Sequence, residues 1–220
     1  GMTETSPVAS IANVTSALAE LPEDELADVR STQGRAMLGV ELRIADQSSG
    51  DVLPWDGVSR GELQAAGPWI AASYYDDPRS PDSFTADGWL RTGDVAVITP
   101  EGYVRIVDRT KDVVKSGGEW ISSVELENEI MAHPKVAEAA VIGVAHPRWS
   151  ERPLACVVVK PGEELTKDEV VGFLEDRVAK WWLPDDVVFI DEVPKTSVGK
   201  FSKKDLRDRF AHHTLPTTGD

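Results

Sequence analysis

Residues 108–120 read Asp108-Arg109-Thr110-Lys111-Asp112-Val113-Val114-Lys115-Ser116-Gly117-Gly118-Glu119-Trp120, and the pattern of the 220-residue chain changes at this stretch. Charged residues flank an apolar pair, and the two glycines that follow allow the backbone to approach another group closely. A solvated turn between strands is the alternative interpretation. Short strands dominate before the stretch, and helices and strands interleave after it. We therefore place a domain boundary at Asp108.

Upstream of this boundary, residues 40–107 predict a small β-rich subdomain. Apolar and charged residues alternate from Val40 to Ile44, which is the period of a half-buried strand, and residues 62–65 follow the same pattern. Residues 95–98 and 103–107 predict two strands joined by a turn at Pro100-Glu101-Gly102. The acidic residues 20–30 predict a short helix or loop.

Downstream of the boundary, the chain predicts a mixed α/β domain. Ser122 and Ser123 precede acidic residues and predict the start of a helix that ends near Ala132. Thr166 with Glu169 has the spacing of a capping box and predicts a helix to about residue 179. Further expected elements are strands at 136–144, 154–159 and 187–190 and a basic helix at 203–210. Their order favours short antiparallel pairing over a long parallel sheet.

The charge of the chain bears on its partners and location. Its net charge of −15 opposes non-specific binding to nucleic acid. Residues 1–108 carry 7 Lys and Arg against 18 Asp and Glu, whereas residues 109–220 carry 16 against 20, so an anionic ligand suits the second part.

The single Cys156 excludes an internal disulfide, and its apolar surroundings predict a buried, structural thiol. No apolar stretch approaches the ~20 residues of a membrane span, so we expect a cytoplasmic protein without a transmembrane segment.

Three further segments contain residues suited to phosphate and ribose chemistry. Near the start, Thr3 and Glu4 could contact a phosphate and its Mg²⁺, or they form a polar loop. Asp94 ends the segment Gly-Trp-Leu-Arg-Thr-Gly-Asp and either accepts hydrogen bonds from ribose hydroxyls or closes a turn. Residues 194–201 are typical of a mobile, Gly-containing loop that ends in Lys200, or they form an exposed basic loop. This loop does not match the phosphate-binding pattern, because Pro194 stands at the first glycine position and Phe201 follows the lysine.

Taken in order, these segments and residues 108–120 resemble the motif series of the adenylate-forming (AMP-binding) enzymes. That superfamily includes acyl-CoA synthetases, luciferases and the adenylation domains of peptide synthetases. The resemblance extends from Gly1 to about Phe210. Residues 115–123, 146–153 and 181–184 are most similar to medium- and long-chain fatty-acid–CoA ligases.

The resemblance implies an α/β (α+β) fold in two domains. Residues 1–108 would be the C-terminal part of the large AMP-binding domain, a β-barrel-like subdomain. Residues 109–220 would be the mobile C-terminal lid domain, which rotates about a hinge at Asp108. Members of the family convert a carboxylate and ATP to an acyl-adenylate and pyrophosphate, and then transfer the acyl group to coenzyme A with release of AMP.

Four residues of the first half and its border match nucleotide-binding positions of the family. By resemblance, Thr3 contacts the AMP phosphate and Glu4 binds Mg²⁺. Asp94 holds the ribose hydroxyls, and Arg109 assists it.

Four residues of the second half match positions that act in the two reaction steps. By resemblance, Lys200 reaches the α-phosphate and the carboxylate during adenylation, where an ammonium stabilises the developing charge. Gly117 and Gly118 line the tunnel for the pantetheine arm of coenzyme A. Lys115 matches a lysine that serves the thioester-forming conformation.

The family's Ser/Thr/Gly-rich phosphate loop does not occur in the sequence. The resemblance therefore predicts that an N-terminal portion is missing and that the chain is inactive alone. Without that portion the first domain would expose apolar surface, through which the chain could form a homo-oligomer. An aryl or short-chain acid:CoA ligase is an alternative enzyme, and a non-catalytic binding module with the lid fold is the alternative from another class. The combination of Lys200, Gly118 and Asp94 favours the enzyme.

Overall fold

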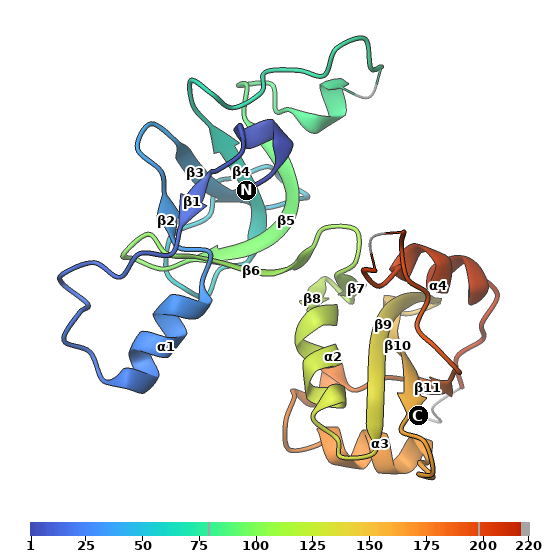
Figure 1. The fold of residues 1–220 in the computed structure, drawn as a ribbon. Coiled ribbons are helices and arrows are strands. Elements are labelled where there is room, and N and C mark those ends of the chain that lie inside the picture. Colours follow the sequence, from blue (N-terminus) through green and yellow to red (C-terminus); the bar gives the residue numbers. More distant parts are fainter. Residues whose placement is uncertain (79, 198, 217–220) are drawn as a thin grey trace. The chain divides into compact units, whose positions relative to one another are not determined.

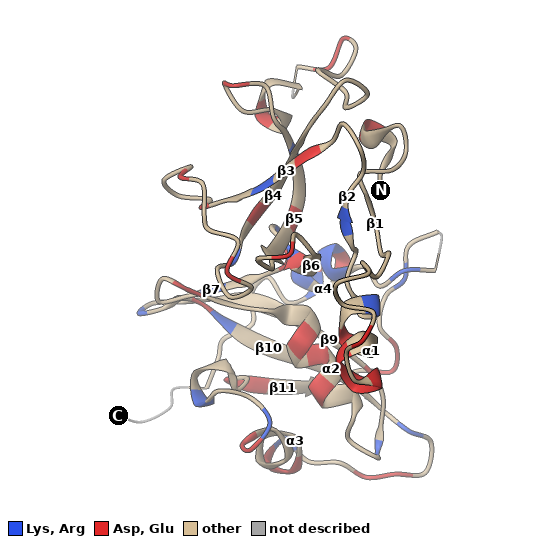
Figure 2. Cartoon of the chain, turned by 90° about the vertical axis from the view of Figure 1, so that its left-hand side faces the viewer, with Lys and Arg blue, Asp and Glu red and all other residues tan. Residues whose placement is uncertain are grey.

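The computed structural model describes residues 1–78, 80–197 and 199–216. The chain divides into two compact units, Gly1–Thr110 and Lys111–Asp220 (Figure 1). Each unit has its own hydrophobic core. Helix α1 (Glu23–Ser31) carries mostly acidic charged residues, and helix α4 (Lys203–Arg209) carries mostly basic ones (Figure 2). In the part of the chain that is described, no helix has the length and hydropathy of a membrane span.

The first unit is built on an antiparallel sheet of four strands in the order β3-β4-β5-β6. Besides α1, its elements are η1 (Thr3–Thr5), β1 (Ser10–Ile11), β2 (Arg35–Ala36), β3 (Glu41–Ala45), β4 (Gly61–Ala66), η2 (Ser80–Ser83), β5 (Leu90–Ile98) and β6 (Val104–Arg109). Strands β1 and β2 form a separate antiparallel pair. The four-stranded sheet is open, and no barrel closes among the described residues.

The alternation of residues along the strands of the first unit separates an apolar face from a polar face. Leu42, Ile44 and Leu63 are buried in the core on one face of the sheet. Their neighbours Arg43 and Gln64 lie on the opposite face, because successive side chains of a strand point in opposite directions. The predicted strands at 40–44 and 62–65 are therefore confirmed within one residue.

The second unit is a sheet of five strands with helices on both faces. Besides α4, its elements are β7 (Val114–Ser116), β8 (Glu119–Ile121), α2 (Ser123–Met131), β9 (Val136–His146), β10 (Ser150–Val159), α3 (Lys167–Leu174), η3 (Lys180–Trp182) and β11 (Asp186–Phe189). Strand β10 pairs antiparallel with β9 along its length and parallel with β11, and it meets β7 at Ser150.

Two clusters of buried side chains show which helices cover which face of this sheet. Leu126 of α2 and Leu174 of α3 pack against Val141 of β9. Leu206 of α4 packs on the other side, with Ile142 of β9 and with Cys156. The side chains of β9 and β10 thus alternate between two helical layers, as expected for strands buried on both faces.

The helix starts of the second unit follow the predicted caps. The hydroxyl of Ser122 accepts a hydrogen bond from the backbone of Glu125, and Thr166 and Glu169 form a reciprocal capping box. Helix α3 ends at Leu174 and not near residue 179, because the chain turns there and Val178 packs against the core. The strand predicted at 187–190 is β11, but its parallel pairing with β10 was not predicted, and neither was the hairpin β7–β8.

Candidate functional site

In the first unit, Asp94 and Arg109 face each other on neighbouring strands beside a cavity of ≈ 290 Å³. The Nε atom of Arg109 is 2.9 Å from Oδ1 of Asp94. Thr92 precedes Asp94 by two residues on β5 and ties this strand to β4, because its hydroxyl donates to the carbonyl of Leu63 at 2.7 Å. Asp94 lies inside β5 and not in a turn, so the alternative interpretation of a simple turn is wrong.

Burial decides the electrostatics of Asp94. Its removal from water raises the pKa of the carboxyl above its ordinary value, and the nearby guanidinium of Arg109 opposes this rise without cancelling it. The ion pair with Arg109 engages Oδ1 of Asp94. Two vicinal hydroxyl groups that enter the cavity could donate hydrogen bonds to this carboxylate, which is the chemistry expected of a ribose.

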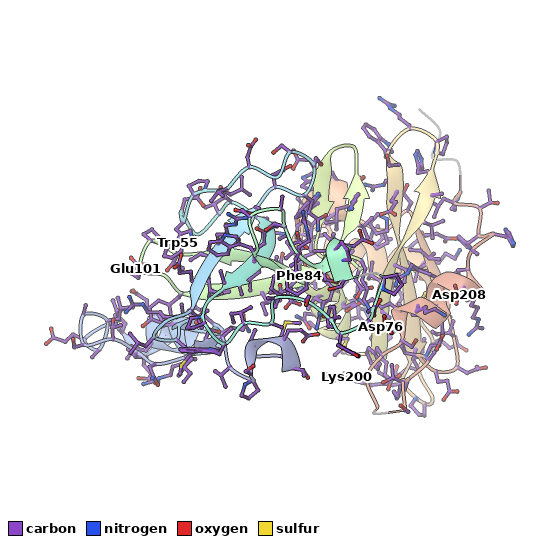
Figure 3. All side chains as sticks on the ribbon, turned by 90° about the horizontal axis from the view of Figure 1, so that it is seen from above. Trp55, Asp76, Phe84, Glu101, Lys200 and Asp208 are labelled. Carbon is purple, nitrogen blue, oxygen red and sulfur yellow. The ribbon has the colours of Figure 1, made fainter. Side chains whose placement is uncertain are left out.

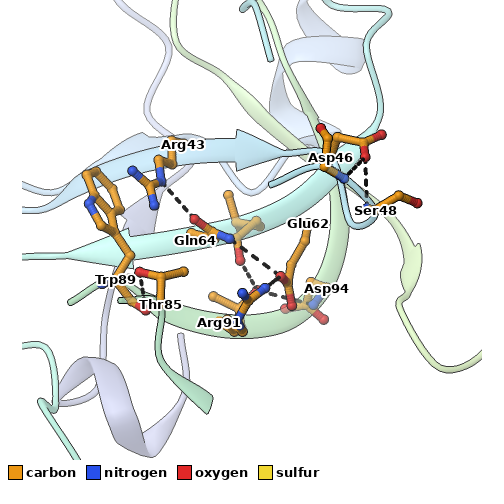
Figure 4. Close-up of polar contacts among 12 residues, drawn as sticks. Arg43, Asp46, Ser48, Glu62, Gln64, Thr85, Trp89, Arg91 and Asp94 are labelled. Carbon is orange, nitrogen blue, oxygen red and sulfur yellow. Dashed lines mark hydrogen bonds and ion pairs between the residues drawn. The ribbon is translucent and has the colours of Figure 1, made fainter. Parts of the chain in front are cut away.

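A polar network on the sheet face opposite the core joins β4 to its neighbours β3 and β5 (Figure 4). Arg43 donates from Nε to Oε1 of Gln64 at 2.7 Å, and Arg91 pairs with Glu62 at 2.7 Å. The guanidinium of Arg43 also binds both oxygens of Asp87, which lowers the pKa of that carboxyl to about 2. These contacts hold the strand that carries Asp94.

The turn Thr3–Thr5 contributes to the same cavity through a residue that was not predicted. Thr5 lines the cavity and is buried, and its hydroxyl donates to the carbonyl of Met2 or of Pro7. Thr3 is exposed and is not among the lining residues. The repeated Thr-x-Thr in this turn was the signal available in the sequence for Thr5.

Glu4 is the candidate ligand for Mg²⁺. Its Oε1 accepts a hydrogen bond from the hydroxyl of Tyr74 at 2.5 Å. A carboxylate with a second oxygen suits Mg²⁺, which proteins hold through one or two carboxylates together with substrate phosphates. In residues 1–78, 80–197 and 199–216, no group of three or more His, Cys, Asp and Glu residues is arranged to hold a metal ion.

In the second unit, Gly117 and Gly118 form the two-residue loop of the β7–β8 hairpin. Both have positive φ angles, of 62° and 90°, as a tight hairpin turn with the right-handed twist of the strands requires. The loop is exposed, and the backbone of Gly117 donates to the carbonyl of Trp149 at 2.8 Å. A Cβ atom on Gly117 would lie 2.8 Å from the Trp149 ring, whereas one on Gly118 would meet nothing within 4 Å.

A cavity of ≈ 870 Å³ lies next to this hairpin and is lined by Gly117, Trp149, Arg152 and Trp181, among others. Arg152 is largely buried and donates to Asp185, to the hydroxyl of Ser116 and to the backbone carbonyls of Trp181 and Leu183. Trp181 lines the cavity, whereas Trp182 packs against the core.

Lys115 and Lys200 are both exposed in the second unit. Figure 3 labels Lys200. The side-chain ammonium of each lysine has no hydrogen bond or ion pair among the described residues. Lys200 lies on a loop closed by its own backbone, because Thr196 donates to the carbonyl of Lys200 at 2.7 Å and Gly199 donates to the carbonyl of Thr196. Val198 of this loop lies outside the described residues.

Asp108, the predicted hinge, lies in β6 of the first unit. It is buried, and its Oδ1 accepts a hydrogen bond from the backbone of Arg109 at 2.7 Å. Rotation about this residue stays a prediction.

Two family models match the chain. Residues 1–75 match the model described as AMP-binding enzyme, and residues 125–200 match the AMP-binding enzyme C-terminal domain.

Individual proteins are similar over nearly the whole chain. A long-chain-fatty-acid–CoA ligase of Thermus thermophilus is 50% identical over 97% of the chain, and a 3-methylmercaptopropionyl-CoA ligase of Ruegeria lacuscaerulensis is 49% identical over 96%. Among solved structures, ATP-bound MatB from Rhodopseudomonas palustris superposes with a TM-score of 0.79 at 32% identity, over 96% of this chain and 40% of that one. The chain spans 39% and 38% of the length of the two ligases.

Proposed function

Because the chain belongs to the adenylate-forming AMP-binding enzymes and matches the C-terminal portion of their acyl-CoA ligases, we propose that it is part of an ATP-dependent fatty-acid:CoA ligase. The complete enzyme converts a fatty acid and ATP to an acyl-adenylate and pyrophosphate. The thiol of coenzyme A then attacks the acyl carbon, the bond to the phosphate oxygen breaks, and the thioester and AMP are released.

The observation that carries the proposal is the exposed ammonium of Lys200 on a loop of the second unit, with no partner among the described residues. In the proposed function this ammonium stabilises negative charge that develops on the α-phosphate and the carboxylate during adenylation. A charge placed where the transition state gains charge lowers the barrier selectively. A lysine on a mobile domain can be brought to the reacting atoms and withdrawn afterwards.

Residues of the first unit bind the nucleotide in this proposal. Asp94 accepts hydrogen bonds from the ribose hydroxyls, and Arg109 holds its carboxylate in place. Thr3 contacts the AMP phosphate, and Glu4 supplies one oxygen ligand to Mg²⁺, which would neutralise phosphate charge when it is bound. The position of Asp94 and Arg109 at the wall of the cavity supports this assignment.

The Gly117–Gly118 hairpin serves the second step in the proposal. The absence of side chains at its tip leaves room for the pantetheine arm, and Lys115 on β7 acts in the thioester-forming arrangement. Residues 109–220 form the lid that turns about Asp108 between the two steps. The open space around Gly118 supports this role.

The test begins with the native polypeptide. We expect its intact mass to exceed that of this chain, its location to be cytoplasmic, and its AMP release with ATP and CoA to be faster for octanoate or palmitate than for benzoate or propanoate. The 220-residue chain alone should form no thioester. A preference for benzoate or propanoate would support an aryl or short-chain ligase, and no AMP release with any acid would overturn the enzyme proposal.

A further inference from the structure

The loop that carries Lys200 is held at both ends by ion pairs to different elements of the second unit. Before the loop, Nζ of Lys195 is 2.7 Å from Oε1 of Glu138 on β9. After the loop, Nζ of Lys203, the first residue of α4, is 2.7 Å from Oε1 of Glu127 on α2. Between these anchors the chain folds back on itself, because Ser202 donates to the carbonyl of Pro194 at 2.7 Å.

The second of these pairs is buried and makes further hydrogen bonds. The side chains of Lys203 and Glu127 are each 11% exposed. Lys203 also donates to the hydroxyl of Ser123 at 2.6 Å, and Glu127 accepts a hydrogen bond from the backbone of Val141 at 2.7 Å. Three elements, α2, β9 and α4, are therefore joined at one point next to the loop.

The position of Lys203 within α4 indicates that it does not serve the stability of that helix. The N-terminus of a helix carries partial positive charge, so a cation in the first turn is unfavourable there. Removing a lysine and a glutamate from water also costs free energy, and buried ion pairs are weak evidence for stability. What the pair does supply is a defined position for the first turn of α4.

The next residue offers a contrast. Lys204 pairs with Asp208 of the same helix at 3.2 Å, and both side chains are well exposed, at 79% and 68%. Such a surface pair contributes little and fixes no other element.

We propose that Lys203, through Glu127, is a positioning residue that fixes the loop carrying Lys200. The proposal rests on the adenylation role proposed above for Lys200. Since Ser202 binds Pro194 and Lys203 follows it directly, loss of the Lys203–Glu127 pair frees the base of the loop. The exposed ammonium of Lys200 then samples a wider volume, and the step that depends on it slows.

Hydrogen exchange on the 220-residue chain tests the positioning itself, without any reference to catalysis. In Lys203→Met, backbone amides of residues 195–202 should exchange on the order of 10-fold faster than in the wild type, because local opening becomes easier. In the control Lys204→Met the same amides should keep their exchange rates. Unchanged exchange in Lys203→Met would overturn the proposal. If Lys203→Met does not fold, Glu127→Gln is read in the same way.

Half-reactions of the complete ligase test the consequence. Lys203→Met should slow acyl-adenylate formation by on the order of 10-fold to 100-fold, since small misplacement of a catalytic group has effects of this size. Thioester formation from supplied acyl-adenylate should stay within about twofold, and Lys203→Arg should restore part of the first step. Equal slowing of both steps would indicate a general folding defect and contradict the proposal. A wild-type ligase that forms no acyl-adenylate would instead overturn the proposed function, whereas the exchange result would still stand.

Discussion

Arg109 lies opposite Asp94 in the register of β5 and β6, and its Nε is 2.9 Å from Oδ1 of that carboxylate. The two partners differ in environment, since the Asp94 side chain is 15% exposed and that of Arg109 is 56% exposed. The half-exposed cation only partly offsets the burial of the carboxylate. This imbalance leads to an unusual expectation for the stability of the unit.

Replacing Asp94 by Asn should not destabilise the protein at pH 7. The pKa of Asp94 in the folded chain is raised, chiefly by burial, so its favourable contribution is present below the pKa of the unfolded chain and is lost as pH rises through the folded pKa. A neutral side chain removes that loss. Thermal unfolding of Asp94→Asn at pH 7 should give a Tm no lower than that of the wild type. In the complete ligase the same change should weaken nucleotide binding by on the order of 10-fold to 100-fold.

Asp46 is the matched control, because the pKa of its carboxyl is shifted in the opposite direction to that of Asp94. Backbone hydrogen bonds from Ser49 and Ser48 lower the pKa of its carboxyl. The stabilising contribution of Asp46 is therefore present above the unfolded pKa and is lost as pH falls. Asp46→Asn should lower Tm at pH 7 and leave nucleotide binding unchanged. If Asp94→Asn lowers Tm as much as Asp46→Asn does, the assignment of the raised pKa is wrong.

Substitutions at the two glycines of the β7–β8 hairpin should have different consequences. Alanine at either position meets an unfavourable positive φ, at a cost of roughly 1–2 kcal/mol. Only Gly117→Ala also places a Cβ atom against the ring of Trp149. We expect the indole resonance of Trp149 to shift in Gly117→Ala and to stay in place in Gly118→Ala, as observed by NMR. Equal shifts in the two variants would show that the contact with Trp149 is not the cause.

Acetylation of Lys200 should separate the two reaction steps in the complete ligase. Acetylation, mimicked by Lys200→Gln, removes the charge that adenylation is proposed to use. Acyl-adenylate formation should fall by on the order of 100-fold or more, whereas thioester formation from supplied acyl-adenylate should persist. Lys204→Gln on the exposed side of α4 is the control and should alter neither step. Equal loss of both steps in Lys200→Gln would count against the assignment.

Cys156 should resist alkylation in the folded protein. Burial raises the pKa of its thiol to about 12, so almost no thiolate exists at neutral pH, and the side chain is fully buried in the core beneath α4. Iodoacetamide at pH 8 should leave the mass of the native chain unchanged and add one group after unfolding in guanidinium. Stoichiometric labelling of the native chain would show that the core opens readily or that the thiol is accessible.

The capping box of α3 should contribute to acid sensitivity. Hydrogen bonds from Lys135 and then from Thr166 lower the pKa of Glu169 to about 2. Its contribution to stability is therefore complete above the unfolded pKa and is lost as pH falls toward 2. Glu169→Gln should flatten the decline of unfolding free energy between about pH 5 and pH 2, measured with urea. Thr166→Ala should destabilise by about 1 kcal/mol.

Local patterns in the sequence were sufficient for most of the elements. The alternation at 40–44 predicted β3, and the caps at Ser122 and Thr166 predicted the starts of α2 and α3. These signals act between neighbouring residues, so they can be read without knowledge of the fold. The motif order likewise led to the adenylate-forming family, which the family models match. The roles of the individual site residues stay predictions.

Contacts between distant segments were decided only by the tertiary structure. Three sets of contacts join residues about 30 to 80 positions apart. They are the parallel pairing of β11 with β10, the five hydrogen bonds and ion contacts around Arg152, and the Lys203–Glu127 pair. The sequence by itself determined the longer strands, the helix caps at Ser122 and Thr166, and the family. The partners of Arg152 and Lys203 came from the fold alone, because the free energy of burying a charged side chain depends on which groups surround it, and those groups come from other elements.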